Sequence, residues 1–359
     1  MRVAILGTGG IGRGYAAFLA GQGHEPVLWS PTGKAVAPDG HLEATGVAPG
    51  RFPVAVAANC GEAVKDAEAI IIATVANGSR AVMEALAPHV VPGQVVIVSA
   101  HCSFSALYLS RLLVERGVET PIAAWATTAL TAKRQGEVGV HISGLRARLD
   151  VATVPARLAE AGEAACVALF GERFQRRDDL LAIMLSNLNP PAHMANLLLN
   201  LTRAEKGEDW PNYGSITPAV GRLIEALDVE RLGLAEAFGL TVRSVTEHFV
   251  LSHHVEAGSV AAMSAAVHAK RPELLGPKTL DTRFVTEDVP FGLVPLELLG
   301  EVLGRPVPLH TAGIALFSAI YGRDFRAEND LLPLLGLAGK SPEALRDLMR
   351  EGWPQPPRG

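Results

Sequence analysis

The sequence contains few cysteines, few aromatic residues and no excess of positive charge. Among its 359 residues are only 3 cysteines and 5% aromatic residues, and its formal net charge is −5. The cysteines lie far apart and lack the spacing of metal ligands, which indicates neither a disulfide framework nor a zinc site. Because Lys and Arg are dispersed along the chain, we expect no nucleic-acid partner. These absences favour a cytoplasmic globular protein without a bound metal.

Long hydrophobic runs are missing as well. The apolar residues 3–6 are followed at once by glycine, and the apolar run at residues 69–73 is too short to cross a bilayer. We therefore expect neither a secretory signal nor a membrane-spanning helix. The hydrophobic fraction is nevertheless 48% of 359 residues, which is enough for the buried cores of two domains.

Two patterns divide the chain. In the first half, short apolar runs alternate with helical stretches, which is typical of a parallel sheet covered by helices. From about residue 180 the strand pattern ends, and apolar residues recur at the three- and four-residue spacing of helices. The sequence therefore predicts an α/β domain of the Rossmann type over residues 1–177 and an all-α domain over residues 178–359.

The expected elements follow from these two patterns. Strands are expected at residues 2–6, 26–29, 69–74, 95–99 and 122–125, with edge strands at 141–142 and 150–153. Helices are expected at residues 11–22, 79–86, 105–115 and 155–169, and in the second domain at 193–201, 218–238, 242–250, 259–270, 293–303 and 342–351.

A glycine-rich turn lies between the first expected strand and the first expected helix. It consists of Gly7, Thr8, Gly9, Gly10, Ile11 and Gly12. This spacing, after an apolar strand and before a helix, predicts the turn that receives the pyrophosphate of a nicotinamide dinucleotide. The alternative is an ordinary strand-to-helix turn. The context favours the dinucleotide site, because a second strand follows and ends at Trp29.

The residues after the second strand favour NADP(H) over NAD(H). An NAD site usually has Asp or Glu there, which accepts a hydrogen bond from the ribose 2′-hydroxyl. This chain has Ser30, Thr32 and Lys34 instead, and Arg13 follows the last glycine of the turn. Hydroxyls and cations suit a 2′-phosphate. The alternative is that Lys34 is a solvated surface charge and that either cofactor binds.

Further candidates follow the next two strands, at the edge of the sheet where ligands bind in open parallel folds. Thr74, Val75 and Ala76 are small enough to leave room for the nicotinamide half of the cofactor. His101 and Ser103 are candidates for substrate binding. For His101, a structural or hydrogen-bonding role is slightly favoured over a catalytic one.

Two segments of the second domain carry residues suited to dehydrogenase chemistry, which needs a proton donor and a cation for a substrate carboxylate. His193 stands at the start of an apolar helix, and Arg283 and Asp288 lie on an irregular segment between prolines and glycines. A helix N-terminus disfavours imidazolium, so His193 needs an anionic partner, which Asp288 could supply. Arg283 could clamp a carboxylate. The alternatives are a capping or packed histidine and a surface salt-bridge cluster.

The order of motifs in the second domain resembles the opine dehydrogenase family, of the octopine/nopaline dehydrogenase type. The similar stretches are residues 189–193, 210–218, 227–231, 283–295 and 335–337. The resemblance implies a helical domain like the C-terminal domain of 6-phosphogluconate dehydrogenase. It also implies an NAD(P)H-dependent reductive condensation of an α-keto acid with the amino group of an amino acid.

The resemblance also implies the roles of individual residues. His193 would be the proton donor and acceptor at the carbonyl or imine, Asp288 would pair with it, and Arg283 would hold a substrate carboxylate. Asn189 and Tyr213 lie in matching stretches and are further candidates for substrate binding. Residues 125–134 match the family only loosely, so the amino substrate is not predicted.

Two other functions fit parts of the sequence. A simple 2-keto acid or 3-hydroxy acid reductase of similar build would consume NADPH with the keto acid alone. A cofactor-sensing protein would bind the dinucleotide without turnover, although it has no need of a proton relay. We therefore expect an opine dehydrogenase without nucleic-acid or membrane partners, whose apolar second-domain helices could support a homodimer.

Overall fold

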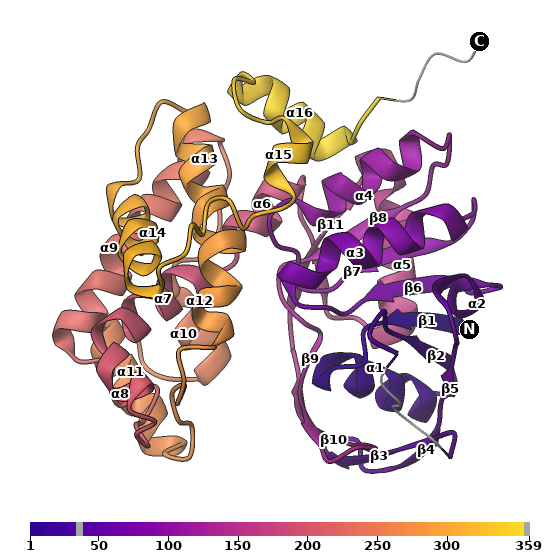
Figure 1. Cartoon of the computed structure of the whole chain (residues 1–359), viewed down its shortest axis with the longest axis horizontal. Coiled ribbons are helices and arrows are strands. Elements are labelled where there is room, and N and C mark those ends of the chain that lie inside the picture. Colours follow the sequence, from indigo (N-terminus) through magenta and orange to yellow (C-terminus); the bar gives the residue numbers. More distant parts are fainter. Residues whose placement is uncertain (34–38, 355–359) are drawn as a thin grey trace. The chain divides into compact units, whose positions relative to one another are not determined.

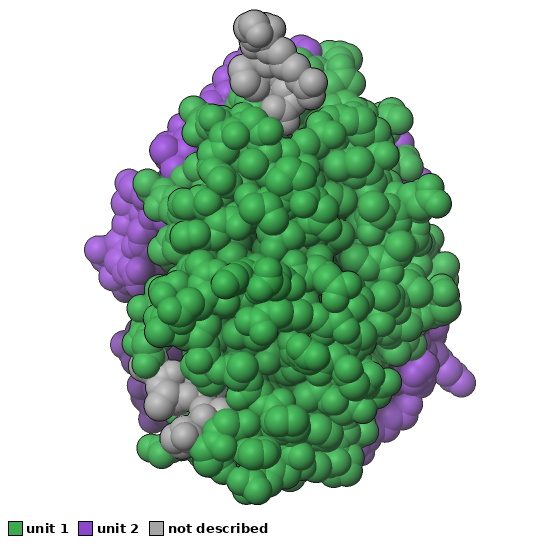
Figure 2. All heavy atoms as spheres, turned by 90° about the vertical axis from the view of Figure 1, so that its right-hand side faces the viewer, with its two compact units in different colours: residues 1–184, 343–359 green, residues 185–342 purple. Residues whose placement is uncertain are grey.

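A computed structural model describes residues 1–33 and 39–354 of the chain. The chain forms two compact units, one made of residues 1–184 and 343–359 and the other of residues 185–342. Figure 1 labels the helices and strands, and Figure 2 colours the first unit green and the second purple. The first unit combines strands and helices, and the second is helical. The prediction of an α/β domain followed by an all-α domain is thus confirmed.

The first unit is built on an eight-stranded sheet of order β12-β11-β8-β7-β6-β1-β2-β5. Neighbouring strands are parallel, except that β11 runs antiparallel to β8. The strand order reverses at β1, because the chain continues to β2 on one side and later returns to β6 on the other. In open parallel sheets, ligands bind at the carboxyl ends of the strands beside such a reversal.

Six of these eight strands were predicted with ends within two residues of the observed ones, and β1 and β8 have the predicted ends. The short strands β5 and β12 were not predicted. The strands of this sheet are β1 Arg2–Leu6, β2 Glu25–Trp29, β5 Ala55–Val56, β6 Ala69–Ile72, β7 Val95–Val98, β8 Ile122–Trp125, β11 Leu149–Val154 and β12 Phe174–Arg176. Strands β1, β6, β7 and β8 are buried along almost their whole length, as expected for strands covered on both faces.

Helices cover this sheet. The helices of the first unit are α1 Gly10–Gly21, α2 Cys60–Val64, α3 Ala76–Leu86, α4 Ser105–Val114, α5 Ala159–Phe170 and α16 Pro342–Glu351, with short 3₁₀ turns at Ala87–His89 and Ala156–Leu158. The ring of Phe170 on α5 lies 5.3 Å from the ring of Tyr15 on α1 and 5.3 Å from that of Trp125 on β8. Such edge-on aromatic contacts add about 0.5–1.5 kcal/mol each beyond the burial of apolar surface.

A second sheet of four strands packs on α1. Its order is β4-β3-β10-β9, with β3 His41–Gly46, β4 Gly50–Pro53, β9 Leu130–Gln135 and β10 Gly139–Leu145. Only the residues 141–142 of β10 are among the predicted strands. The rest was missed because half of each strand faces solvent, so that β9, for example, has only Leu130 and Ala132 as apolar residues.

The last helix, α16, belongs to the first unit although it follows the second unit in sequence. Its side chains Leu345 and Met349 are fully buried, and Arg346 Nε lies 3.3 Å from the buried carboxylate of Asp179. The predicted division at residues 177 and 178 placed this helix in the second domain. In the structure, the first unit instead continues to Met184 and also includes α16.

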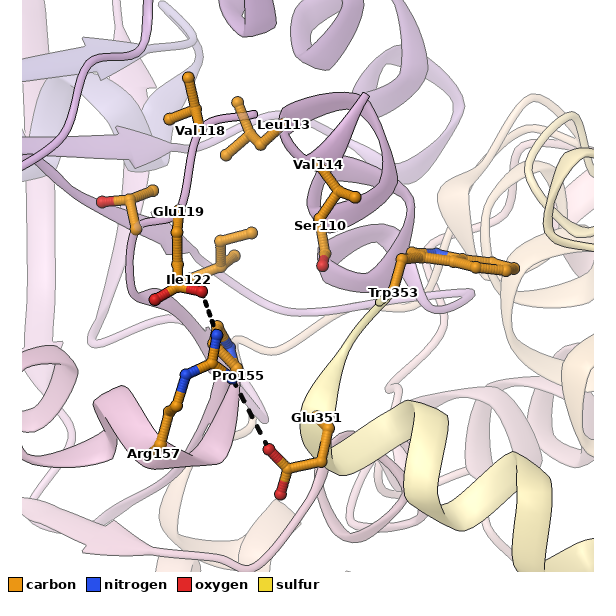
Figure 3. Close-up of a pocket in the computed structure, with 11 residues that line it drawn as sticks. Ser110, Leu113, Val114, Val118, Glu119, Ile122, Pro155, Arg157, Glu351 and Trp353 are labelled. Carbon is orange, nitrogen blue, oxygen red and sulfur yellow. Dashed lines mark hydrogen bonds and ion pairs between the residues drawn. The ribbon is translucent and has the colours of Figure 1, made fainter. Parts of the chain in front are cut away.

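The segment after α16 is also held by the first unit. Trp353 Nε1 donates a hydrogen bond to the carbonyl oxygen of Leu107 on α4, at 3.1 Å. Figure 3 shows Trp353 beside a small cavity and, below it, Arg157 between the carboxylates of Glu119 and Glu351. These contacts fix the described end of the chain on the first unit.

All the secondary-structure elements described in the second unit are helices. They are α7 Asn189–Leu199, α8 Leu201–Glu205, α9 Pro218–Ala237, α10 Val245–His253, α11 Val260–Lys270, α12 Arg283–Thr286, a π-helical turn η3 Val289–Leu293, α13 Val294–Val302, α14 Pro308–Tyr321 and α15 Leu332–Leu335. Helix α6, Leu180–Leu185, ends where this unit begins. Helix α14 was not predicted, because it carries apolar side chains on its exposed side too, such as Leu316 at 48% exposure.

A buried ion pair on α9 binds the backbone at Leu185 and at the start of α10. Arg231 on α9 is fully buried, and its Nη2 lies 2.6 Å from Asp228 Oδ1. The same guanidinium donates to the carbonyl oxygens of Leu185 and Arg243, and Asp228 accepts a hydrogen bond from Val245 N at 2.8 Å. Removal of one partner would leave a buried charge unpaired, at a cost of about 3–5 kcal/mol. Residues 227–231 therefore have a structural role, since they stabilise the packing around α9.

Candidate active site

The glycine turn connects β1 to α1 and leaves the start of the helix accessible. Gly9 is the N-cap of α1, and no side chain accepts a hydrogen bond from the first backbone N–H groups. Gly9 is exposed, and a Cβ there would meet no protein atom within 4 Å. A Cβ at Gly12 would instead overlap the carbonyl oxygen of Gly7. An accessible helix start with uncapped N–H groups fits the pyrophosphate of a dinucleotide.

Arg13 has a different role from the predicted one. Its side chain is only 1% exposed, and it donates hydrogen bonds to the carbonyl oxygens of Thr8 and Glu137. Burial lowers its pKa, and the nearby positive charge of Arg134 lowers it further. Arg13 therefore braces the backbone around the turn, and it is not an accessible charge for a 2′-phosphate.

The carboxyl ends of β2 and β6 carry the other cofactor candidates. Ser30 Oγ lies 3.0 Å from Thr32 Oγ1, on the surface after β2, and Lys34 lies outside the described residues. Thr74 and Val75 lie between β6 and α3, and Val75 is the N-cap of α3 without a capping side chain. Ala76 is the buried first residue of α3. These segments lie on both sides of the β1 turn in the strand order.

The segment after β7 combines burial with an unusual backbone. Ala100, Ser103 and Phe104 have positive φ values of 58°, 49° and 58°. Left-handed conformations of residues other than glycine cost of order 1–3 kcal/mol each and cluster at functional sites. His101 and Ser103 are both fully buried. This segment therefore stores strain at the ligand-binding edge of the sheet.

His101 cannot act as a general acid near neutral pH. Burial lowers its pKa to about 3, so the ring is neutral in that range. Neither ring nitrogen has a hydrogen-bond partner among the described residues. A neutral imidazole offers one donor and one acceptor, and both lack a partner here although the ring is fully buried.

His193 and Asp288 meet in the second unit. His193 lies near the start of α7 and Asp288 directly before η3, and His193 Nδ1 is 2.6 Å from Asp288 Oδ2. Their side chains are only 16% and 10% exposed. Two prolines, Pro190 and Pro191, form the first turn of α7, where their missing N–H groups cost nothing. Gly292 allows η3 to approach, because a Cβ there would overlap Pro190.

Phe284 covers one face of the His193 ring. The ring centroids lie 3.6 Å apart and the planes are within 5° of parallel. Phe284 and Asp288 come from the same segment, so one contacts the ring at its face and the other at Nδ1. This leaves Nε2 without a hydrogen bond to any described residue. The sequence did not single out Phe284, since an aromatic residue next to a short helix is usually core.

The remaining site candidates lie at varied places in the second unit. Arg283 begins α12 and is exposed, and its guanidinium makes no hydrogen bond or ion pair with a described residue. Asn189 is the exposed first residue of α7. Tyr213 belongs to an aromatic cluster, where its hydroxyl lies 3.3 Å from His253 Nε2. The structure thus joins His193 to Asp288 and puts Tyr213 with His253.

Neither a metal cluster nor a membrane helix is found in residues 1–33 and 39–354. No three His, Cys, Asp or Glu side chains in this part of the chain are arranged to hold a metal ion. No helix there is both long and apolar enough to cross a membrane. The three cysteines, Cys60, Cys102 and Cys166, form no disulfide bond.

The fold and the site define a class of protein. An open glycine turn on a parallel sheet and a largely buried histidine–aspartate pair on a helical unit are typical of a nicotinamide-dependent dehydrogenase. The two sets of residues belong to different compact units.

Sequence comparisons identify the family. The model of the alpha-helical domain of NAD/NADP octopine/nopaline dehydrogenase matches residues 176–321, and the model of ketopantoate reductase PanE/ApbA matches residues 3–153. An opine dehydrogenase of Arthrobacter sp. strain 1C is 32% identical over 351 residues, which cover 96% of this chain and 97% of that protein. Vitopine synthase of Allorhizobium ampelinum is 26% identical over 361 residues, which cover 97% and 99%.

Solved structures share the fold over almost the whole chain. Octopine dehydrogenase with NADH and L-arginine superposes with a TM-score of 0.79 at 14% identity, covering 96% of this chain and 97% of that one. Yersinopine dehydrogenase with NADP⁺ gives a TM-score of 0.68 at 15% identity, with coverage of 94% and 97%.

The chain belongs to the opine dehydrogenase family. It is an NAD(P)-dependent oxidoreductase that acts on CH–NH bonds, and its reaction is the reductive condensation of an α-keto acid with the amino group of an amino acid. The predicted family, fold class and enzyme class are therefore confirmed.

Two glycines of the turn give separable predictions. Gly9→Ala should leave the melting temperature unchanged, because its Cβ meets no protein atom, yet weaken NADPH binding roughly tenfold, or about 1.4 kcal/mol, by blocking the approach of the pyrophosphate. Gly12→Ala should weaken binding and also lower stability by about 1–3 kcal/mol, because its Cβ overlaps Gly7. Thermal melting and fluorescence titration measure both. Wild-type NADPH affinity in Gly9→Ala would rule out this turn as the pyrophosphate site.

Proposed function

We propose that this enzyme uses NADPH in preference to NADH, with His193 as proton donor and acceptor and Arg283 as the clamp of the keto acid carboxylate. The observation that carries the assignment of His193 is its 2.6 Å hydrogen bond to Asp288. When bound at the glycine turn, the cofactor supplies the hydride for the reduction. The other steps fall to residues of the chain.

His193 donates and accepts the protons that move during the condensation. The amine nitrogen bonds to the keto carbon, and the carbonyl oxygen leaves as water after it has taken up protons. The hydrogen bond to Asp288 keeps a proton on Nδ1, so Nε2 is the atom that exchanges protons with the substrate. When Nε2 is also protonated, the Asp288 carboxylate stabilises the positive ring.

Arg283 has the exposure and the freedom to bind a carboxylate. Its guanidinium is exposed and pairs with no described side chain, and a carboxylate can accept two parallel hydrogen bonds from it. It precedes Phe284, which stacks on His193, so the clamp lies on the segment that packs against the proton donor. Octopine dehydrogenase structures contain pyruvate and L-arginine. Pyruvate is therefore the first keto acid to assay, and Asn189, Tyr213, His101 and Ser103 remain candidates for contacts with the substrates.

The preference for NADPH rests on the residues after β2. Ser30 and Thr32 offer hydroxyls where an NAD site usually has an acidic side chain, and Lys34 follows in sequence. No carboxylate stands in residues 29–34 to repel a 2′-phosphate. Solved relatives bind NADH in octopine dehydrogenase and NADP⁺ in yersinopine dehydrogenase, so both cofactors occur in this fold.

Location and assembly complete the proposal. None of Cys60, Cys102 and Cys166 forms a disulfide bond, which suits a reducing compartment, so we propose the cytoplasm. Helix α14 exposes the apolar side chains Leu316 and Ile320, at 48% and 42% exposure, and such a face could support a homodimer.

Removal of the imidazole tests the proton transfer. His193→Ala should lower turnover with keto acid and amino acid by about 10²- to 10⁴-fold, because the reaction loses its general acid–base group. The NADPH dissociation constant should stay nearly unchanged, since the cofactor site lies in the first unit. Initial rates of NADPH oxidation and a fluorescence titration measure the two effects. The control is His248→Ala in α10, whose turnover should stay near that of the wild type. If the His193 variant had unchanged turnover, His193 would have no part in the mechanism.

Replacement of the stacked aromatic ring tests its positioning role. Phe284→Leu should lower kcat by about 2- to 10-fold, because the ring stacking that orients His193 is worth about 0.5–1.5 kcal/mol. Phe284→Tyr should retain the activity. In the Leu variant, the NMR signals of the His193 ring protons should also move, since they lose the ring current of Phe284.

The control for this prediction lies in the same turn. Thr286→Val removes the 3.1 Å hydrogen bond from Thr286 Oγ1 to the carbonyl oxygen of Thr282 without removing an aromatic ring. It should leave kcat near the wild-type value. If Thr286→Val and Phe284→Leu were equally impaired, a general loosening of the turn would explain the result better than ring stacking.

Cofactor choice is tested at the end of β2. NADPH should bind more tightly than NADH, and Thr32→Val should weaken NADPH by about tenfold, because a hydrogen bond to a charged group is worth about 1.5 kcal/mol at the weaker end of its range. The affinity for NADH, which lacks the 2′-phosphate, is the internal control and should not change. Tighter binding of NADH to the wild-type protein would contradict the preference.

A further inference from the structure

Strand β9 lies directly against the start of α1. A Cβ at Gly10 would stand 2.9 Å from the carbonyl oxygen of Ala132, 3.2 Å from the Cα of Lys133 and 3.1 Å from the backbone nitrogen of Arg134. Gly10 directly follows the N-cap Gly9. The absence of a side chain at Gly10 therefore brings residues 132–134 to the helix end that suits the pyrophosphate.

The alternation of β9 determines which side chain faces the helix. Leu130 and Ala132 point toward α1, because their side-chain carbons would lie 2.9 Å and 2.8 Å from a Cβ at Gly14. Arg134 is two residues further along the strand and lies on this same face. Lys133 lies on the opposite face, where it is paired across the ladder with His141.

The guanidinium of Arg134 has N–H donors that make no hydrogen bond with a described residue. Arg134 is exposed, and its Nε donates to the carbonyl oxygen of Gly136 at 3.0 Å. Its other N–H groups make no hydrogen bond with a described residue. Neither Arg134 nor the nearby Arg13 forms an ion pair with a carboxylate in the described part of the chain.

Two like charges therefore lie close to a helix start that is itself positive. Arg13 is buried between the carbonyl oxygens of Thr8 and Glu137, and part of the lowering of its pKa comes from the charge of Arg134. The N-terminus of α1 adds the positive end of the helix dipole. An anion placed at Gly9 would relieve this repulsion, and Arg134 is the exposed member of the pair.

We propose that Arg134 is a cofactor-binding residue, which donates charge-assisted hydrogen bonds to the dinucleotide pyrophosphate at the start of α1. This inference rests on the proposed cofactor site. It gives the four-stranded sheet a function, since the β9–β10 hairpin carries a cation to the glycine turn. The target is the pyrophosphate because the backbone of Arg134 adjoins Gly10, and the pyrophosphate is common to NADPH and NADH.

Direct binding measurements test the inference independently of turnover. Titration calorimetry with NADPH and with NADH should show that Arg134→Met weakens both cofactors by a similar factor of roughly tenfold or more. Arg134→Lys should recover part of the affinity. Lys133→Met removes one positive charge from the adjacent position on the other face of β9, and it should bind both cofactors within about twofold of wild type. Melting temperatures verify that the variants are folded.

Each other outcome overturns a defined part of the account. If Arg134→Met binds both cofactors like wild type, or if Lys133→Met loses as much affinity, Arg134 has no specific role and the proposed function stands. If only NADPH is weakened, Arg134 contacts the 2′-phosphate and the pyrophosphate assignment is wrong. If the wild-type protein binds neither dinucleotide, the proposed cofactor site itself fails.

Discussion

The hydrogen bond between His193 and Asp288 joins residues 95 positions apart in the chain. Its geometry depends on how closely the segment 283–293 can pack on the first turn of α7. Gly292 allows that approach, because any side chain there would overlap Pro190. The π-helical turn follows Asp288, and Phe284 lies one helical turn before it, stacked on the imidazole. The ring is thus held at one face and at Nδ1, which directs its chemistry to Nε2.

Buried charges elsewhere in the second unit keep its helices in place. Glu230 on α9 accepts hydrogen bonds from the backbone N–H groups of Leu309 and His310 and from the His310 ring, so it caps the start of α14. On the same helix, Asp228 and Arg231 connect α9 to α10. Buried pairs like these are costly to break and fix one arrangement of the helices. We infer that residues 227–231 resemble the corresponding family motif because they hold the helices together, not because they take part in catalysis.

Much of the fold could be predicted from the sequence, and the failures have identifiable causes. Strands such as β1 and β8 are continuous apolar runs, because both of their faces are covered. The four-stranded sheet was largely missed, because one face of it is in water and alternate residues are polar. Helix α14 was missed for the opposite reason, since its apolar residues surround the helix. The position of α16 depends on tertiary packing that no local pattern contains.

The candidate site was predictable only where chemistry alone identifies a residue. His193, Asp288 and the glycine turn were recognisable from residue type and context. Phe284 and Arg134 were not, because their roles depend on what they approach in space. Arg13 was misassigned for a related reason: a cation after the last glycine suggests a phosphate ligand, but burial between two carbonyl oxygens makes it a brace.

The most direct test of the account is the mass of the product formed with deuterium-labelled NADPH. With pyruvate and an amino acid, the account predicts a secondary amine that contains both carbon skeletons, one deuterium at the former keto carbon and one water fewer than the two substrates supply. The hydride of the cofactor accounts for the label, and the loss of water for the C–N bond. A deuterated 2-hydroxy acid beside unchanged amino acid would contradict the account and indicate a simple keto acid reductase.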